Sequence, residues 1–222
     1  IYGNFLKCVI CEVCYRWRKD MDIKVDHVSK AYGEQQILRD LCCVFPEGKT
    51  TCIRGRSGCG KTTLIRLLLG LDIPDKGKIE GISDRKISAV FQEDRLCENL
   101  SAASNIRLVC TETISDRELE EAYKAVALTE VWQKPVRELS GGMRRRVSIL
   151  RALLADSDCV IMDEPLRGLE EKTRTTTIDY ILKKTEGKTL IFVTHEEQEA
   201  VWLKADKPLK FMQDPLIKES GK

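Results

Sequence analysis

Alternating apolar and polar residues mark the start of regular structure in this chain. The stretch MDIKVDHV, residues 21–28, alternates with a period of two, which predicts a strand around Ile23–Val28. The chain continues through AYGEQQILRDL to a β-branched stretch, Thr50–Arg54, which predicts a second strand. We therefore expect β-structure ahead of the glycine-rich stretch that begins at Gly55.

Two continuous apolar runs predict strands that are buried on both faces. One is Cys159–Met162, which ends at Asp163 and Glu164; the other lies within KTLIFVTH and ends at His195. The carboxyl ends of parallel strands meet at one edge of a sheet, where open α/β folds bind ligands. If all the strands run parallel, the three side chains share that edge.

Helical spacing appears in two further segments. SDRELEEAYKAVAL begins with a capping Ser115, has acids early, and places Leu119, Ala122 and Val126 on one face. The segment after Gly142 has apolar residues at Met143, Val147, Leu150 and Leu154.

Composition excludes several classes of protein. The 222 residues are 42% hydrophobic and 32% charged, as in an ordinary globular protein. The formal net charge of +2 lacks the basic excess of nucleic-acid-binding proteins, so we expect no nucleic-acid partner. The sequence contains no run of about 18 apolar residues, so it predicts no membrane span. The 10 cysteines are scattered, which favours reduced thiols in the cytoplasm.

The first 20 residues differ in character from the rest of the chain. Cys8, Cys11 and Cys14 have a spacing that can open an iron–sulfur site, but the fourth cysteine of such a site is missing. Our hypothesis is that Met21 is the natural start and that residues 1–20 are an extension that is not native. We expect residues 216–222 to form a tail.

The stretch GRSGCGKTT has the spacing of a phosphate-binding loop. Gly55, Gly60, Lys61 and Thr62 match G-x-x-x-x-G-K-[ST] between a predicted strand and a helix that Gly70 can end. Glycines let backbone N–H groups surround phosphates, Lys61 neutralises charge and the Thr62 hydroxyl can ligate Mg²⁺. A chance glycine turn is the alternative, and Cys59 is interpreted as structural. The candidate nucleotide-binding residues here are Gly55, Arg56, Ser57, Gly58, Cys59, Gly60, Lys61, Thr62 and Thr63.

The residues at the predicted strand ends suggest a catalytic site. Asp163 is placed to hold Mg²⁺, and Glu164 to orient and deprotonate an attacking water. The alternative, a pair of solvated acids capping the turn at Pro165, is disfavoured by the upstream phosphate loop. His195 could contact a γ-phosphate, although a lone histidine is usually a surface or core residue.

A second anion-binding feature lies at LSGGMRRRVSIL, residues 139–150. Ser140, Gly141 and Gly142 precede a predicted helix, whose N-terminus attracts anions. The arginines at 144–146 fall in its first turn, where cations oppose the helix dipole. The alternative is a serine cap followed by a solvated basic face.

Five motifs together carry a family resemblance. GRSGCGKTT, VFQED, LSGGMRRRVSILRALL, CVIMDEP and VTH, in that order, closely resemble the nucleotide-binding subunit of ATP-binding cassette (ABC) transporters over Met21 to about Phe211. The resemblance implies an α/β fold: a P-loop NTPase, RecA-like core with a mostly parallel sheet, an antiparallel β subdomain and an inserted α-helical subdomain. It implies one ATPase domain over residues 21–215, with its core at 21–92 and 140–215 and its helical subdomain at 93–139.

The resemblance also implies roles for single residues. Tyr32 resembles the aromatic residue that stacks on adenine, and Gln92 the glutamine that contacts Mg²⁺ and the water. Ser140, Gly141 and Gly142 resemble the signature that closes on the ATP of a second subunit, in a head-to-tail homodimer. Arg145 stands where the family often has Gln, and Glu170 where an Asp is usual.

The resemblance further implies ATP and Mg²⁺ as cofactors and transmembrane permease subunits as partners, together with an extracytoplasmic solute-binding protein. The chain would lie peripherally on the cytoplasmic face of the membrane. FQEDRL and LSGGM look like the branch that imports nitrate, sulfonate and taurine, so a small anion is the expected solute. The alternatives are another small-solute importer or exporter, or an ABC ATPase outside transport.

Overall fold

The computed structural model describes residues 22–83, 85–112, 114–129 and 131–210. The expectations for residues 1–20, for the cysteine cluster within them and for the tail at 216–222 lie outside the described residues. The described chain forms two compact units, which are considered separately. The first comprises the residues up to Glu47 and the stretch that begins at Arg56; the second comprises Gly48–Gly55 and Arg85–Lys210.

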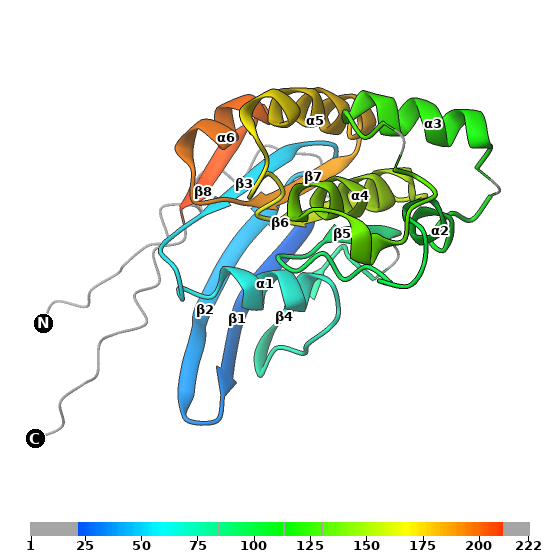
Figure 1. Ribbon diagram of the computed structural model, residues 1–222. Helices are drawn as coiled ribbons and strands as arrows, with labels where there is room; N and C mark the ends of the chain where they lie inside the picture. The colour runs from blue at the N-terminus through cyan, green and yellow to red at the C-terminus, as the bar shows by residue number, and fades with distance from the viewer. Residues whose placement is uncertain (1–21, 84, 113, 130, 211–222) are drawn as a thin grey trace, which may run out of the picture. The chain divides into compact units, whose positions relative to one another are not determined.

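The described residues of the first unit form an antiparallel sheet and helix α1, Lys61–Leu68 (Figure 1). The strand order is β2-β1-β4, where β1 is Ile23–Tyr32, β2 is Gln35–Phe45 and β4 is Lys76–Glu80. Helix α1 ends just before Gly70, which has a φ of 65° as expected for a terminating glycine. The predicted strand at Ile23–Val28 is confirmed as part of β1.

Strand β2 has no counterpart among the predicted strands. Its buried positions do not alternate, because the pairing of β1 with β2 shifts register between Val25 and Val28 and again near Lys30. His27 and Asp40, one on each strand, have φ values of 51° and 48°, in the left-handed region. Such irregularities move side chains from one face to the other and conceal the period of two.

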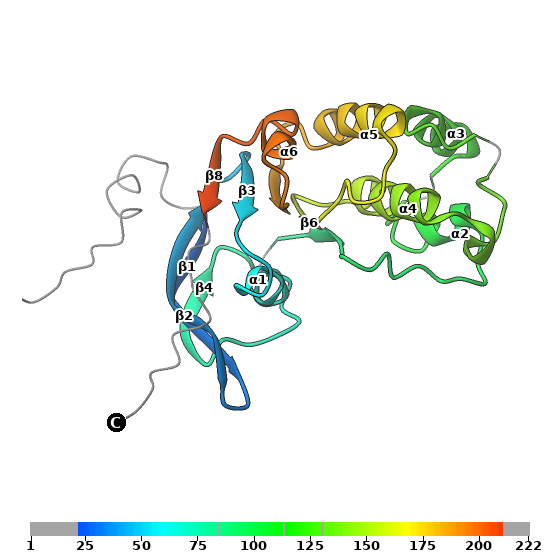
Figure 2. The ribbon, with the colours of Figure 1, turned by 60° about the vertical axis from the view of Figure 1, so that its left-hand side comes forward.

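The second unit is built on a five-stranded parallel sheet of order β5-β6-β7-β3-β8. The strands are β3 (Thr50–Arg54), β5 (Ile87–Val90), β6 (Cys159–Asp163), β7 (Thr189–Val193) and β8 (Lys207–Lys210). Every residue of β6 and β7 is buried, which confirms the interpretation of both apolar runs. Figure 2 shows β3 and β8 side by side, as their pairing requires.

Helices pack with this sheet into one apolar core. They are α2 (Ala102–Arg107), α3 (Asp116–Ala125), α4 (Gly141–Leu154), α5 (Glu171–Lys184), α6 (Glu197–Trp202) and the 3-10 helix η2 (Val136–Glu138). Both predicted helices are confirmed: Ser115 caps α3 in a full capping box with Glu118, and Ser140 caps α4. Within the described residues, no helix has the length and apolarity needed to cross a membrane.

Candidate nucleotide-binding site

The glycine-rich loop runs from the end of β3 to the start of α1. In the first unit Gly58 and Gly60 have φ values of 79° and 99°, which side chains rarely adopt. A Cβ atom added to Gly60 would lie 2.6 Å from Leu38 Cδ2 and 3.2 Å from Ile37 Cγ2. The loop therefore passes against β2 so closely that only glycine fits at this position.

Lys61 and Thr62 occupy the first turn of α1. Lys61 is 6% exposed, and its Nζ donates a hydrogen bond of 2.8 Å to the Arg56 carbonyl oxygen, so the ammonium group lies against the loop backbone. Thr62 is exposed, and the first turn of α1 contains no acidic residue. Cys59 is 1% exposed, in keeping with a structural role. The lysine and the helix N-terminus offer hydrogen-bond donors to a nucleotide phosphate, and the hydroxyl group offers an oxygen ligand to Mg²⁺.

Tyr32 lies in the same unit and is 44% exposed. Its hydroxyl donates a hydrogen bond of 2.5 Å to Asp72 Oδ2, and Lys30 Nζ lies 3.3 Å from Asp72 Oδ1 and 5.6 Å from the tyrosine ring centroid. The pKa of the Asp72 carboxyl is lowered from 3.8 to about 2, chiefly by the hydrogen bond from Tyr32, with smaller contributions from the Ile73 N–H and the Lys30 ammonium group. Asp72 therefore anchors the hydroxyl of a half-exposed ring, an arrangement suited to stacking a flat base. No sequence signal identified Asp72.

The acidic edge lies in the second unit. Asp163 is the last residue of β6 and is 4% exposed, and Glu164 follows with a φ of 49°. The Glu164 N–H donates to the Val193 carbonyl, and Glu164 Oε1 lies 2.7 Å from His195 Nε2. The parallel pairing of β6 with β7 thus brings together the three side chains expected at one edge. The carboxylate of Glu164 is only 16% exposed, so the alternative of two solvated acids is wrong.

Gln92 follows β5, the neighbour of β6, and is exposed at the same edge. The second unit therefore holds an amide, two carboxylates and an imidazole at the carboxyl ends of three adjacent parallel strands. Oxygen donors of this kind suit Mg²⁺, and the paired carboxylate and imidazole suit the activation and positioning of water.

The start of α4 is exposed to solvent. Ser140 Oγ accepts a hydrogen bond of 3.3 Å from the Met143 N–H, and nothing lies within 4 Å of a Cβ added to Gly141. A Cβ on Gly142 would lie 3.3 Å from the Gly168 carbonyl oxygen. A side chain at position 142 would thus be in tight contact with the Gly168 carbonyl, whereas Gly141 leaves open space in front of the helix.

The arginines after this glycine pair do not form a solvated face. Arg145 and Arg146 are 4% and 8% exposed, so that expectation is wrong for both. Arg146 donates to the carbonyl oxygens of Val126 and Ala127 at 2.9 and 2.7 Å, and Arg145 to backbone oxygens near the strand ends. Long guanidinium side chains with five donors pair with carbonyls that helix and strand ends leave free. The sequence did not reveal these distant partners.

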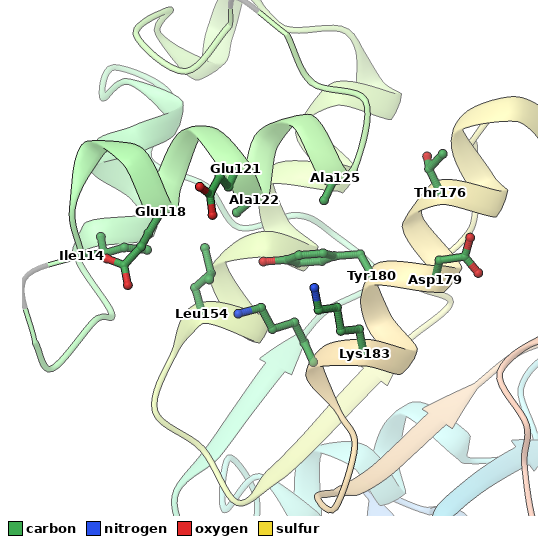
Figure 3. A pocket seen from close by; sticks show the side chains of 11 residues that line it. Ile114, Glu118, Glu121, Ala122, Ala125, Leu154, Thr176, Asp179, Tyr180 and Lys183 are labelled. Atoms are coloured by element: carbon green, nitrogen blue, oxygen red, sulfur yellow. The ribbon is translucent and has the colours of Figure 1, made fainter.

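A separate pocket of about 530 Å³ lies between α3 and α5 (Figure 3). Its lining includes Glu118, Ala122, Tyr180 and Lys183, and none of the candidate site residues.

The glycine loop, the acid-bearing strand ends and the exposed serine–glycine helix start define a P-loop nucleotide-binding protein. Comparison with known proteins agrees: residues 38–167 match the ABC transporter family. The chain therefore belongs to that family.

Two curated relatives are import ATP-binding proteins. The chain is 34% identical to a sulfate/thiosulfate import ATP-binding protein, CysA, of Synechococcus elongatus, over 82% of this chain and 58% of the relative. It is 36% identical to a spermidine/putrescine import ATP-binding protein, PotA, of Fusobacterium nucleatum, over 81% of this chain and 52% of the relative. The chain therefore spans little more than half the length of these relatives.

Solved cassettes share the fold. A dimeric post-hydrolysis state of the ATP-binding cassette MJ0796, bound to ADP and Pi, aligns with a TM-score of 0.75 at 28% identity, covering 85% of this chain and 93% of that one. A bacterial Atm1-family ABC exporter with ATP bound aligns with a TM-score of 0.77 at 23% identity, covering 89% of this chain and 38% of that one. The likeness to the exporter supports the fold alone.

Proposed function

We propose that this cassette hydrolyses ATP to power the passage of a solute through transmembrane permease subunits, from the cytoplasmic face of the membrane. The observation that carries the proposal is the edge of the parallel sheet, where Glu164 and His195 meet at 2.7 Å beside Asp163. Phosphoryl transfer to water needs positioning and charge stabilisation, and no covalent intermediate on the protein.

Each candidate residue has a defined task in this proposal. Lys61 and the loop backbone bind the phosphates, and Tyr32 stacks on the base. Thr62 of the first unit, and Asp163 and Gln92 of the second, are the residues that would hold Mg²⁺, and the ion would supply positive charge to the phosphate oxygens. Glu164 orients the water and accepts its proton, and His195 contacts the terminal phosphate.

A head-to-tail homodimer explains the second anion-binding feature. The start of α4 is exposed, and a Cβ added to Gly141 would meet only open space, so an anion can approach the helix N-terminus. In the dimer, Ser140, Gly141 and Gly142 close on the ATP held by the other subunit. Supporting this proposal, the related MJ0796 cassette forms a dimer in its post-hydrolysis state with ADP and Pi.

The test is ATP hydrolysis by the purified chain and by Glu164→Gln. We expect the variant to bind ATP, to lose turnover by about 10²–10⁴-fold, and to accumulate as an ATP-bound dimer in size-exclusion chromatography. Glu186→Gln, at an exposed site in the loop after α5, is the control with the same change of chemistry and should retain turnover. Turnover near the wild-type rate in Glu164→Gln would refute Glu164 as the base.

Ser140→Arg tests whether turnover requires the dimer. The added side chain would fill the space in front of α4, so turnover should fall while binding of ATP to the phosphate loop persists. If turnover stayed at the wild-type level, the signature would not contact the nucleotide of a second subunit.

The solute is proposed from the sequence resemblance as a small anion such as nitrate, sulfonate or taurine, with an extracytoplasmic solute-binding protein in the system. One relative imports sulfate and thiosulfate, which supports an anion, and another imports polyamines, which are cations. Solute-dependent stimulation of ATP turnover in the membrane-reconstituted complex would decide between them. Export, or a role outside transport, would instead be indicated by turnover independent of a solute-binding protein or by salt-sensitive binding to nucleic acid.

A further inference from the structure

Arg145 connects two segments of the second unit that carry candidate catalytic residues. Its side chain is 5% exposed. On one side, Nη1 donates to the Phe91 carbonyl oxygen at 2.5 Å and to Asp94 Oδ1 at 3.1 Å. Both acceptors flank Gln92 in sequence, and the Gln92 carbonyl lies 3.5 Å from the same nitrogen.

On the other side, the same guanidinium binds the end of β6. Nη2 donates to the carbonyl oxygens of Asp163 at 2.6 Å and Glu164 at 2.5 Å, and Nε donates to that of Pro165 at 3.2 Å. The five N–H donors of arginine thus have five close partners, three on this segment and two on the Gln92 segment. A single rigid plane holds the backbone on both sides of the site.

We propose that Arg145 is a positioning residue that sets the spacing between the Gln92 segment and the Asp163–Pro165 segment, and thereby the rate of hydrolysis and not the affinity for ATP. The inference rests on the proposed function of those two segments. The atoms of Asp163 and Glu164 that accept from Arg145 here are their backbone carbonyl oxygens. Glu164 has a φ of 49°, a strained conformation that persists only when surrounding contacts hold it, and its carbonyl oxygen is one of the acceptors of Arg145.

Glutamine, which the family often has at this position, cannot reproduce the arrangement. Its side-chain amide has two donors, so at least three of the five acceptors would lose their partner. Lysine keeps the charge but presents its three donors from a single point, without the planar fork. Of the three side chains, only arginine has enough donors in the right plane for the acceptors around position 145.

The first test is hydrogen–deuterium exchange in nucleotide-free protein. It measures how well the backbone amides of the two segments are protected and does not require activity. Arg145→Gln should speed exchange in peptides that cover 91–94 and 163–165, where the Glu164 N–H bonds to Val193. Arg146→Gln is the matched control, because Arg146 is also buried on α4 but binds Val126 and Ala127. Its changes should appear near 126–127 and leave the two site segments as in the wild type.

The second test separates rate from affinity. Arg145→Gln should lower kcat by roughly 10- to 100-fold, as expected for small misplacements of catalytic groups, with an unchanged Kd for ATP. Arg145→Lys should fall between it and the wild type. Asp94→Asn, which removes the charge of one acceptor and leaves the carbonyls, should have the smallest effect.

These outcomes decide the inference. Wild-type exchange at both segments in Arg145→Gln, or loss of ATP affinity with unchanged kcat, would overturn it. If Arg145→Gln did not fold, the same two measurements on Arg145→Lys and Asp94→Asn would stand in its place. Absence of turnover in the wild-type protein would count against the proposed function but not against the positioning role of Arg145. The exchange experiment measures the backbone protection of the two segments without nucleotide or activity.

Discussion

Replacing Gly60 by alanine tests how the phosphate loop is held in the first unit. Two costs add at this position. The φ of 99° forces an L residue into a left-handed conformation, which costs about 1–2 kcal/mol. The new methyl would also lie 2.6 Å from Leu38 Cδ2, on a side chain that is fully buried, and such overpacking costs about 1–3 kcal/mol.

We therefore expect Gly60→Ala to lower the free energy of unfolding by about 2–5 kcal/mol and to abolish ATP binding. Gly58→Ala is the matched control, because Gly58 has a φ of 79° and nothing lies within 4 Å of its added Cβ. The free energy of unfolding of Gly58→Ala should fall only by the cost of the left-handed conformation, about 1–2 kcal/mol. Urea unfolding measures both variants.

A double-mutant cycle isolates the steric part. Leu38→Ala removes the group that the new methyl would strike, so the losses from Gly60→Ala and Leu38→Ala should be less than additive, by about 1 kcal/mol or more. Strict additivity, or equal losses for Gly58→Ala and Gly60→Ala, would refute the argument that close approach to β2 requires glycine at position 60.

Two further predictions concern other parts of the chain. Glu170 is the N-cap residue of α5 but makes no side-chain capping bond, so Glu170→Asp should stabilise the protein by about 0.5–1 kcal/mol in urea unfolding; no gain would refute the capping argument. Because Tyr32, together with Ile73 and Lys30, lowers the pKa of Asp72 from 3.8 to about 2, the ionised carboxylate stabilises the fold above about pH 4, and this contribution is lost as the pH falls toward 2. Asp72→Asn should therefore be less stable than the wild type at pH 7, and the difference should close between pH 4 and pH 2; a difference that persisted below pH 2 would contradict the assignment.

The sequence alone predicted the elements whose signal is local. The phosphate-binding loop, the apolar run of β6 and the cap of α4 each depend on residues within a few positions of one another. Glycine conformation, helix capping and continuous burial act at that range, so the order of residues suffices to predict these features. The meeting of Glu164 with His195 also followed, because parallel strands bring their carboxyl ends to one edge.

Other features were decided by the tertiary structure. Strand β2 was missed because the left-handed residue Asp40 within it and the shifts of register against β1 hide its period. Asp72 supports Tyr32 from 40 positions away, and the bond between Arg145 and Phe91 spans 54. A hydrogen bond depends on where its donor and acceptor lie in space, and the spacing of residues along the chain carries no record of which distant carbonyl an arginine will reach.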